Sequence, residues 1–195
     1  MKSVLISIQP KWCELIASGK KTVEIRKTKP KIYTPFKCYI YCTKSKKTYE
    51  SFAVSGKPYE CGGKVIGEFV CDDFTYIEAG YDTNGNKHLY NTAFVEHRMA
   101  IPDLELFEYL YKRREKCGGW AWHISNLVIY DKPKELSEFV VEGDCSCNGC
   151  NKCKWFDKGN GYNVEDDCRL PYEYDFKSVR PLKRPPQSWC YVETQ

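Results

Sequence analysis

Hydrophobic and polar residues alternate along several short stretches of the chain, and the apolar members are often β-branched. Residues 36–43 show the pattern most clearly, because Cys38, Ile40 and Cys42 fall on one face. A two-residue period places successive side chains on opposite faces of a sheet. The pattern therefore predicts β-strands at residues 4–8, 22–26, 36–43, 64–74, 120–130 and 187–193.

Apolar residues at helical spacing predict two helices. The first begins at Pro10, a residue favoured in the first turn of a helix, and runs to about Ser18. The second begins at Pro102 and is stopped by the pair Gly118 and Gly119. Because the strands are short and the helices are few and not regularly interleaved with them, we expect an α+β fold. A small mixed or antiparallel barrel with flanking helices fits this pattern better than a doubly wound parallel sheet.

Three polar intervals separate these elements. Residues 27–35 are rich in Lys and Pro and are expected to form a surface loop. Residues 44–63 are interrupted by glycine and proline, and they are predicted to be a loop with at most short ordered pieces. Residues 76–91 contain the turn sequence Thr83-Asn84-Gly85-Asn86, which predicts a hairpin or a mobile flap.

The length and charge of the chain set broad limits. A chain of 195 residues can bury a core and suggests one domain of ordinary size with an appended lobe. The 30 Lys and Arg against 26 Asp and Glu give a net charge of +4, which does not by itself indicate a polyanion partner but is compatible with a local basic groove. The aromatic fraction of 15% suits either base stacking or a packed β core.

No apolar stretch approaches the length of a signal peptide core or of a membrane span, which needs about 20 apolar residues. We therefore expect a cytoplasmic protein without a membrane partner. Twelve cysteines in such a reducing compartment argue against a disulfide framework. Those that are scattered along the chain are expected to be buried or unremarkable thiols, namely Cys13, Cys38, Cys42, Cys61, Cys71, Cys117 and Cys190.

The other cysteines lie close together in the sequence. Two-residue spacing lets thiolates turn back onto one ion, and four such sulfurs fill the tetrahedral shell of zinc. Because protein sulfur would supply every ligand, the site would be structural and would hold together a lobe with few apolar residues. An iron-sulfur cluster is the alternative. The predicted zinc ligands are Cys147, Cys150, Cys153 and Cys168, with Cys145 as a substitute.

Residues 19–26 (GKKTVEIR) hold the strongest candidate for a binding site. Gly19 suits the left-handed end of a helix, and the strand after it alternates apolar residues with Glu24 and Arg26. Lys21, at the turn, is placed to lean over the same charged face. These side chains form a ligand-binding face or, as the alternative, a solvated strand edge.

Three further residues are weaker candidates. Glu68 lies inside the predicted strand 64–74, where it faces solvent or joins a cleft. His123 and Ser125 share one face of the predicted strand 120–130. A lone histidine in a strand is either a satisfied structural residue or part of a site.

Several of these segments resemble the ASCH domain family (activating-signal-cointegrator homology), a branch of the PUA-like superfamily. The later segments look like those of bacterial and phage-type members that carry a cysteine-rich insert. The resemblance spans nearly the whole chain and is carried by residues 19–26 (GxKxxExR), 119–136 (GWAWHIS followed by KPKEL) and 184–192 (RPPQSWCYV).

The resemblance implies a PUA-like β pseudo-barrel of five or six mostly antiparallel strands with flanking helices. Residues 1–141 and 185–195 would form the barrel, and residues 142–184 would form the metal-stabilised cysteine-rich lobe. The family comparison also places the strand with His123 and Ser125 near the ligand cleft.

The resemblance also implies a role in binding RNA or a modified nucleoside, without catalysis. Lys21, Glu24 and Arg26 would line the cleft. The chemistry agrees, because the two cations can meet phosphate or carbonyl oxygens and Glu24 can accept a hydrogen bond from an exocyclic amine. Trp120 could stack on a base.

Hydrolysis is the alternative function. Some small relatives with a similar barrel are acetylcytidine amidohydrolases that use a lysine, a threonine and a glutamate. Lys21 matches the lysine, Glu68 is a candidate for the glutamate, and Glu24 stands in place of the threonine. In a hydrolase, Glu24 would act as a general base on water while Lys21 stabilises the oxyanion. A third possibility is that the cysteine-rich lobe binds a protein partner.

Overall fold

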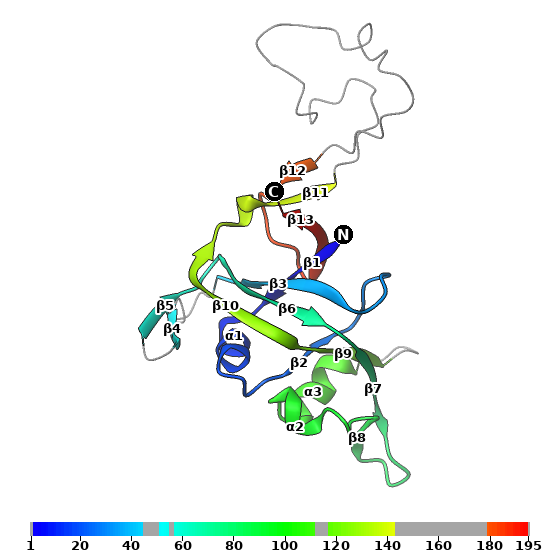
Figure 1. The fold of residues 1–195 in the computed structure, drawn as a ribbon. Helices are drawn as coiled ribbons and strands as arrows, with labels where there is room; N and C mark the ends of the chain where they lie inside the picture. The colour runs from blue at the N-terminus through cyan, green and yellow to red at the C-terminus, as the bar shows by residue number, and fades with distance from the viewer. Residues whose placement is uncertain (1, 45–50, 55–56, 112–116, 143–178, 195) are drawn as a thin grey trace, which may run out of the picture.

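A computed structural model describes residues 2–44, 51–54, 57–111, 117–142 and 179–194 (Figure 1). These residues form thirteen strands, three α-helices and one 3-10 helix. In chain order the elements are β1 (Ser3–Ile8), α1 (Pro10–Ala17), β2 (Val23–Arg26), β3 (Phe36–Cys42), β4 (Ser51–Val54), β5 (Lys57–Glu60), β6 (Val65–Cys71), β7 (Phe74–Tyr81), β8 (Lys87–Tyr90), α2 (Glu96–Met99), α3 (Asp103–Leu110), β9 (Gly118–His123), β10 (Ser125–Lys134), η1 (Leu136–Glu138), β11 (Phe139–Glu142), β12 (Val179–Pro181) and β13 (Trp189–Thr194).

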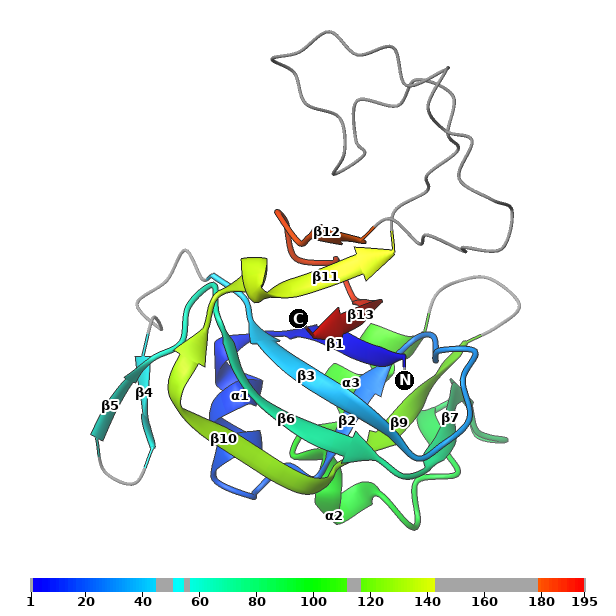
Figure 2. The same cartoon turned by 45° about the horizontal axis from the view of Figure 1, so that its top comes forward.

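Two sheets carry most of these strands. A seven-stranded sheet has the order β10-β6-β3-β1-β13-β11-β12, and a four-stranded sheet has the order β2-β9-β7-β8. Within the described residues, β1 and β3 are the one parallel pair. Figure 2 shows the curved strands β3, β6 and β10 side by side, with α1 behind them. The α+β class with mostly antiparallel strands is confirmed, but the strands are more numerous than the expected five or six and do not form a closed barrel.

Two predicted strands are in fact broken at a corner where the chain passes from one sheet to the other. The predicted strand 64–74 separates into β6 and β7, and the predicted strand 120–130 separates into β9 and β10. Bends of this kind let one segment serve two sheets that cross each other. His123 and Ser125 therefore lie in different strands, and their predicted common face is wrong.

The space between the sheets is filled by aromatic and β-branched side chains. Trp122 is fully buried there. Its ring centroid lies 5.5 Å from that of Phe74, 6.1 Å from that of Phe36 and 6.0 Å from that of Trp189. Trp122 thus packs against rings from three other strands.

The scattered cysteines contribute to the packing as free thiols. Five of them, Cys13, Cys38, Cys42, Cys61 and Cys71, are buried, and the other two are partly exposed. The sulfur atoms of Cys42 and Cys61 lie 3.3 Å apart. Burial is the largest cause of the raised pKa of Cys71, which is about 12. The prediction that these are buried or unremarkable thiols is confirmed.

The predicted turn near residue 84 is a hairpin between β7 and β8. The Asp82 carboxylate accepts hydrogen bonds from the backbone N–H groups of Asn84 and Asn86, and Gly85 has a φ of 79°. A positive φ at this position is easily adopted by glycine. A second hairpin, β4–β5, lies within the segment predicted as a loop.

The cysteine-rich insert lies mainly outside the described residues. The strands β11 and β12 pair with each other and flank residues 143–178, which contain Cys147, Cys150, Cys153 and Cys168. The predicted zinc site therefore stays a prediction. Among the residues that the structure describes, no group of three or more His, Cys, Asp and Glu is placed to hold a metal ion. No helix in these ranges is long and apolar enough to cross a membrane.

Candidate functional site

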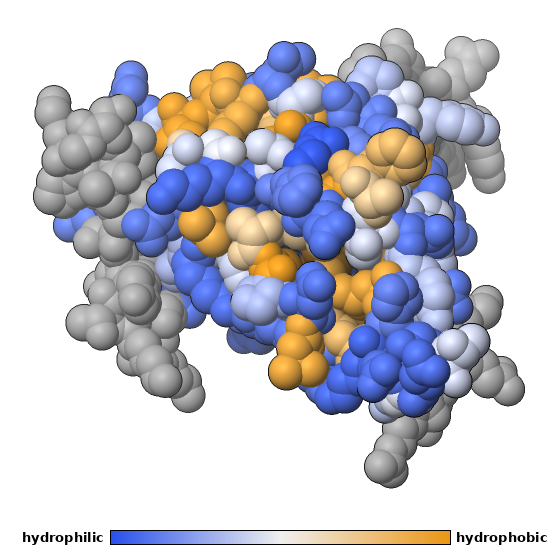
Figure 3. Space-filling model, turned by 90° about the horizontal axis from the view of Figure 1, so that it is seen from below, coloured by the Kyte–Doolittle hydropathy of each residue, from blue (hydrophilic) through white to orange (hydrophobic). Residues whose placement is uncertain are grey.

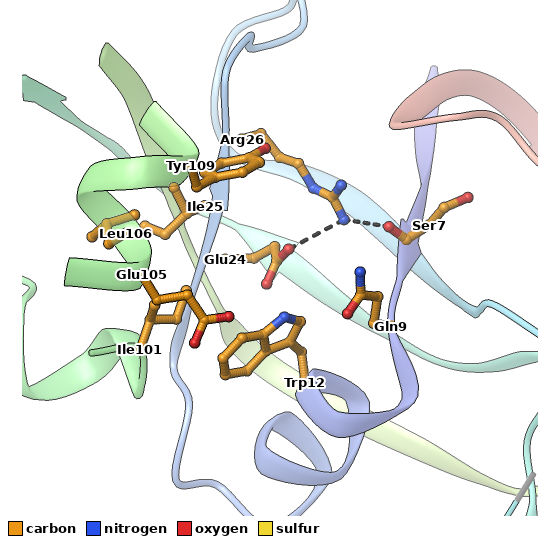
Figure 4. Close-up of a pocket in the computed structure, with 10 residues that line it drawn as sticks. All are labelled: Ser7, Gln9, Trp12, Glu24, Ile25, Arg26, Ile101, Glu105, Leu106 and Tyr109. Carbon is orange, nitrogen blue, oxygen red and sulfur yellow. Dashed lines mark hydrogen bonds and ion pairs between the residues drawn. The ribbon is translucent and has the colours of Figure 1, made fainter. Parts of the chain in front are cut away.

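A cavity of about 180 Å³ lies beside β2, between α1 and α3 (Figure 4). The end of β1, the first turn of α1, strand β2 and helix α3 each supply part of its wall. A typical site for a drug-sized ligand has about 300–1,000 Å³, so this one suits a smaller group. Its lining residues are Ser7, Gln9, Trp12, Glu24, Ile25, Arg26, Ile101, Glu105, Leu106 and Tyr109.

Glu24 is the buried charge at the centre of this site, with an exposed fraction of 5%. Its Oε1 lies 3.1 Å from Nη2 of Arg26, and its Oε2 lies 3.6 Å from Nζ of Lys21. The Arg26 Nη2 also donates to the backbone oxygen of Ser7. A buried carboxylate needs such partners, because an unpaired charge in a site with little water is costly.

Lys21 supports Glu24 from outside the cavity lining. Its exposed fraction is 1%, and its Nζ donates to the backbone oxygen of Met99, at the end of α2, over 2.7 Å. Burial lowers the pKa of Lys21, while Glu24 acts in the opposite direction. The amino group is therefore held between Glu24 and α2.

The sequence after α1 brings these charges into place. Gly19 has a φ of 73°, as expected for the residue that follows a helix end. The backbone N–H of Lys21 then donates to the oxygen of Leu15, and that of Thr22 donates to the oxygen of Arg98. The turn is thus fixed to both α1 and α2, which directs the next residues into β2.

The open edge of β2 faces the cavity. Strand β2 is the outer strand of its sheet, and Ile25 is one of the lining residues. The backbone N–H of Ile124 donates to the oxygen of Thr22, so every second pair along the two strands is hydrogen-bonded, namely Glu24 with Trp122 and Arg26 with Trp120 of β9. The N–H and C=O of Ile25, which lies between them, therefore point to the open edge. The cavity therefore offers a backbone donor and acceptor beside the Glu24 carboxylate.

Two aromatic side chains complete the wall. Figure 4 shows Tyr109 and Trp12 on either side of the Glu24 carboxylate. Burial raises the pKa of Tyr109, so its hydroxyl is neutral and can donate a hydrogen bond. Aromatic faces next to a carboxylate and a guanidinium suit a flat, polar ligand.

A second, larger hollow of about 740 Å³ lies between β8, α2 and α3. The face that carries these elements, at the bottom of Figure 1, is seen directly in Figure 3, where apolar patches are separated by polar surface. Phe94 and Leu104 have exposed fractions of 84% and 61%. The charged residues of this hollow are exposed, unlike Glu24, so it is the weaker candidate.

The other predicted site residues lie outside the lining of the cavity beside β2. Glu68, on β6, receives hydrogen bonds from Lys37 over 2.7 Å and from the hydroxyl of Tyr130 over 2.6 Å. Burial raises the pKa of Glu68, but the bonds from Lys37 and Tyr130 outweigh this effect, and the pKa is lowered. The hydroxyl of Ser125 donates to the backbone oxygen of Val70 over 3.0 Å. The structure therefore groups Lys21, Glu24 and Arg26, and it leaves Glu68 and Ser125 elsewhere.

His123 belongs to a separate polar cluster. Its Nε2 lies 2.9 Å from the hydroxyl of Thr75, and its Nδ1 lies 3.4 Å from Nη1 of Arg98. Burial, followed by the Arg98 charge, lowers the pKa of His123 below 6.5, while Asp73 acts in the opposite direction. The neutral ring links β7, β9 and α2, which is a structural arrangement.

This lowered pKa predicts a pH-dependent stability. Below 6.5 the unfolded chain takes up a proton that the folded His123 resists, so the free energy of unfolding falls as the pH decreases toward the folded pKa. Urea unfolding of the wild type and of His123→Gln across this range is the test. The variant should lose this part of the pH dependence, whereas the exposed control His97→Gln should keep it. If the free energy of unfolding depended on pH in the same way in all three proteins, His123 would not be the source of this dependence.

Several lining residues were not predicted from the sequence as site residues. The hydrophobic pattern places Trp12 only among the apolar residues of the first helix, and it does not mark Glu105 or Tyr109 as site residues. Glu105 and Tyr109 are four residues apart, so they lie on one face of α3. This spacing was the available signal, but it does not indicate which part of the chain α3 contacts.

The fold is that of a small α+β domain with mostly antiparallel strands. The model of the ASCH domain family matches residues 6–127, and the chain belongs to this family. The crystal structure of ASCH from Zymomonas mobilis is similar, with 19% identity over 69% of this chain and 73% of that chain and a TM-score of 0.46. The crystal structure of a tyrosine-to-phenylalanine mutant of that protein is also similar, with 19% identity over 70% of this chain and 77% of the mutant chain and a TM-score of 0.47. No curated protein matches the chain.

Proposed function

We propose that the cavity beside β2 binds one nucleobase of RNA, or a modified nucleoside, without catalysing a reaction on it. The family has a PUA-like fold that is associated with RNA binding. The observation that carries the proposal is the buried Glu24 carboxylate, held by Arg26 at 3.1 Å beside a base-sized cavity.

The chemistry of the cavity favours a base with an exocyclic amine. A carboxylate has about four lone-pair positions, and Lys21 and Arg26 occupy only part of them. The remaining positions can accept from an amine, while the N–H and C=O of Ile25 can pair with a neighbouring edge of the base. Trp12 and Tyr109 offer aromatic surface to the ring.

Cytidine and uridine form the sharpest pair of ligands for a test. They differ at C4, where cytidine has an amine donor and uridine a carbonyl acceptor. A carbonyl facing Glu24 would leave both acceptors unpaired, at a cost of about 1–3 kcal/mol. We therefore expect cytidine to bind about tenfold more tightly than uridine.

Calorimetric titration of wild type and Glu24→Gln tests this proposal. The amide of the variant can donate as well as accept, so the preference for cytidine should largely disappear. The matched control is Glu78→Gln, an exposed glutamate on β7, which should bind as the wild type does. Equal affinities of wild type and Glu24→Gln for both nucleosides would overturn the assignment of the cavity.

Binding is favoured over amide hydrolysis by three observations. Lys21 donates to the backbone of Met99 and is not a lining residue. Glu68 is paired with Lys37 on another strand. Glu24 stands where the amidohydrolase pattern has a threonine. Product formed from acetylcytidine by the wild type, above the level of a Lys21→Ala control, would instead favour the hydrolase.

A further inference from the structure

A row of side chains crosses the four-stranded sheet next to the cavity. Arg26 of β2 stands opposite Trp120 of β9, and Trp120 stands opposite Tyr76 of β7. Residues directly opposite each other in antiparallel strands point to the same face, with Cβ atoms about 4.5–5.5 Å apart. The row therefore begins at a residue that lines the cavity and continues away from it.

The outer part of this row is aromatic and accessible. The ring centroids of Trp120 and Tyr76 are 5.0 Å apart, and Tyr76 has an exposed fraction of 37%. Trp120 is partly exposed. Two neighbouring rings on a sheet surface are the arrangement on which unpaired bases stack.

A lysine-rich segment lies over the row. The Nζ of Lys29 is 4.0 Å from the centre of the Trp120 ring, and the Nζ of Lys27 is 4.8 Å from the centre of the Tyr109 ring at the cavity. No ion pair of Lys29 with an acidic residue occurs within the described part of the chain. Lys29 and Lys31 are both exposed.

The positive charge of the whole chain is concentrated in this segment. Residues 26–37 (RKTKPKIYTPFK) contain five of the 30 Lys and Arg and none of the 26 Asp and Glu. The segment therefore has a charge of +5, while the rest of the chain has a charge of −1 within the total of +4. Arg26 and Lys37, at the two ends of the segment, pair with Glu24 and Glu68, so the lysines between them carry the local excess that complements a polyanion.

The segment is also fixed in position. The indole Nε1 of Trp189 donates to the hydroxyl of Thr28 over 3.1 Å, and the backbone N–H of Lys31 donates to the hydroxyl of Tyr191 over 2.8 Å. Both partners belong to β13, in the seven-stranded sheet. The segment is thus anchored to the seven-stranded sheet, while Lys29 lies over Trp120 of the four-stranded sheet. This anchoring reduces the entropy lost when the lysines bind phosphates.

We propose that a single strand of RNA leaves the cavity along the row Arg26–Trp120–Tyr76. This inference rests on the proposed binding of one base in the cavity. The next base stacks on Trp120 in place of the Lys29 ammonium, and Lys29 and Lys31 bind the phosphates on either side. The physiological ligand is therefore an RNA strand rather than a free nucleoside.

The test compares cytidine 5′-monophosphate with a five-nucleotide RNA that contains a single cytidine, by fluorescence or calorimetric titration. The oligonucleotide should bind the wild type at least about tenfold more tightly, because stacking and phosphate contacts are added. Trp120→Leu should reduce the oligonucleotide affinity toward that of the monophosphate and leave the monophosphate affinity unchanged. Lys29→Ala should reduce the oligonucleotide affinity more than the monophosphate affinity, because the monophosphate has at most one of the two phosphates. The control Lys132→Ala, an exposed lysine on β10, should change neither.

The outcomes separate this inference from the proposed function. Monophosphate binding without any gain for the oligonucleotide, or a gain that survives both Trp120→Leu and Lys29→Ala, would overturn the RNA path and leave the cavity assignment intact. Oligonucleotide binding that depends on Trp120 but not on Glu24 would overturn the cavity assignment instead. Because Lys29 is exposed, Lys29→Ala gives an answer even where Trp120→Leu does not fold. A duplex that binds as tightly as the single strand would also contradict the path.

Discussion

Replacing Glu24 by alanine is expected to lower the free energy of unfolding by about 3–5 kcal/mol. The substitution removes the carboxylate shared by Lys21 and Arg26, whose side chains have exposed fractions of 0% and 12%. Both cations then remain in a site with little access to water, and the backbone oxygens of Met99 and Ser7 are their remaining partners. Urea unfolding followed by circular dichroism measures the change.

A matched control for this effect is Glu68→Ala. Glu68 also pairs with a lysine, but the Lys37 side chain has an exposed fraction of 45%. A pair of this kind contributes about 1 kcal/mol or less. Adding Lys21→Met to Glu24→Ala should recover part of the lost stability, because it removes one of the two unpaired cations. Equal losses for Glu24→Ala and Glu68→Ala would contradict the view of Glu24 as a buried shared counter-ion.

Replacing Trp122 by alanine is expected to cost a similar amount, about 3–5 kcal/mol. Trp122 is fully buried between the two sheets, and its ring meets those of Phe36, Phe74 and Trp189. Removing it leaves a void that the three neighbouring strands cannot fully close. The loss should appear as a lower urea midpoint with an unchanged dependence on urea concentration.

Trp122→Phe separates the packing of this residue from its polar atom. The indole Nε1 is buried and has no hydrogen-bond partner in the described structure. Phenylalanine removes this unsatisfied donor while it keeps an aromatic ring, so the cost should be about 1.5 kcal/mol or less. A loss as large as that of Trp122→Ala would contradict the packing account, since it would make the indole itself indispensable.

Local patterns predicted the individual elements better than their assembly. The alternation in residues 36–43 and the proline at residue 10 gave a strand and a helix close to β3 and α1. The corners at Asp72–Asp73 and Ile124 were missed, because apolar residues resume directly after them and a hydrophobic period does not reveal which sheet a strand joins. Such corners depend on long-range packing between sheets.

For the candidate site, the sequence predicted the residues of one short segment but not their partners from other segments. Lys21, Glu24 and Arg26 lie together, as a turn followed by a two-residue period predicts, but Lys21 is not among the residues that line the cavity. The partners from other segments could not be predicted, since neither Trp12 nor Tyr109 carries a local signal of lying beside β2. Their role follows from the packing of α1 and α3 on the two sides of the strand.

The central claim is that a base enters the cavity beside β2 with its amine edge toward Glu24. A crystal structure of the protein with cytidine bound tests it most directly. The account predicts the ring between Trp12 and Tyr109, with the exocyclic amine within hydrogen-bonding distance of Oε1 or Oε2 of Glu24. A cytidine found only at another surface, with the Glu24 carboxylate still bound to Lys21 and Arg26 and the cavity filled by water, would contradict it.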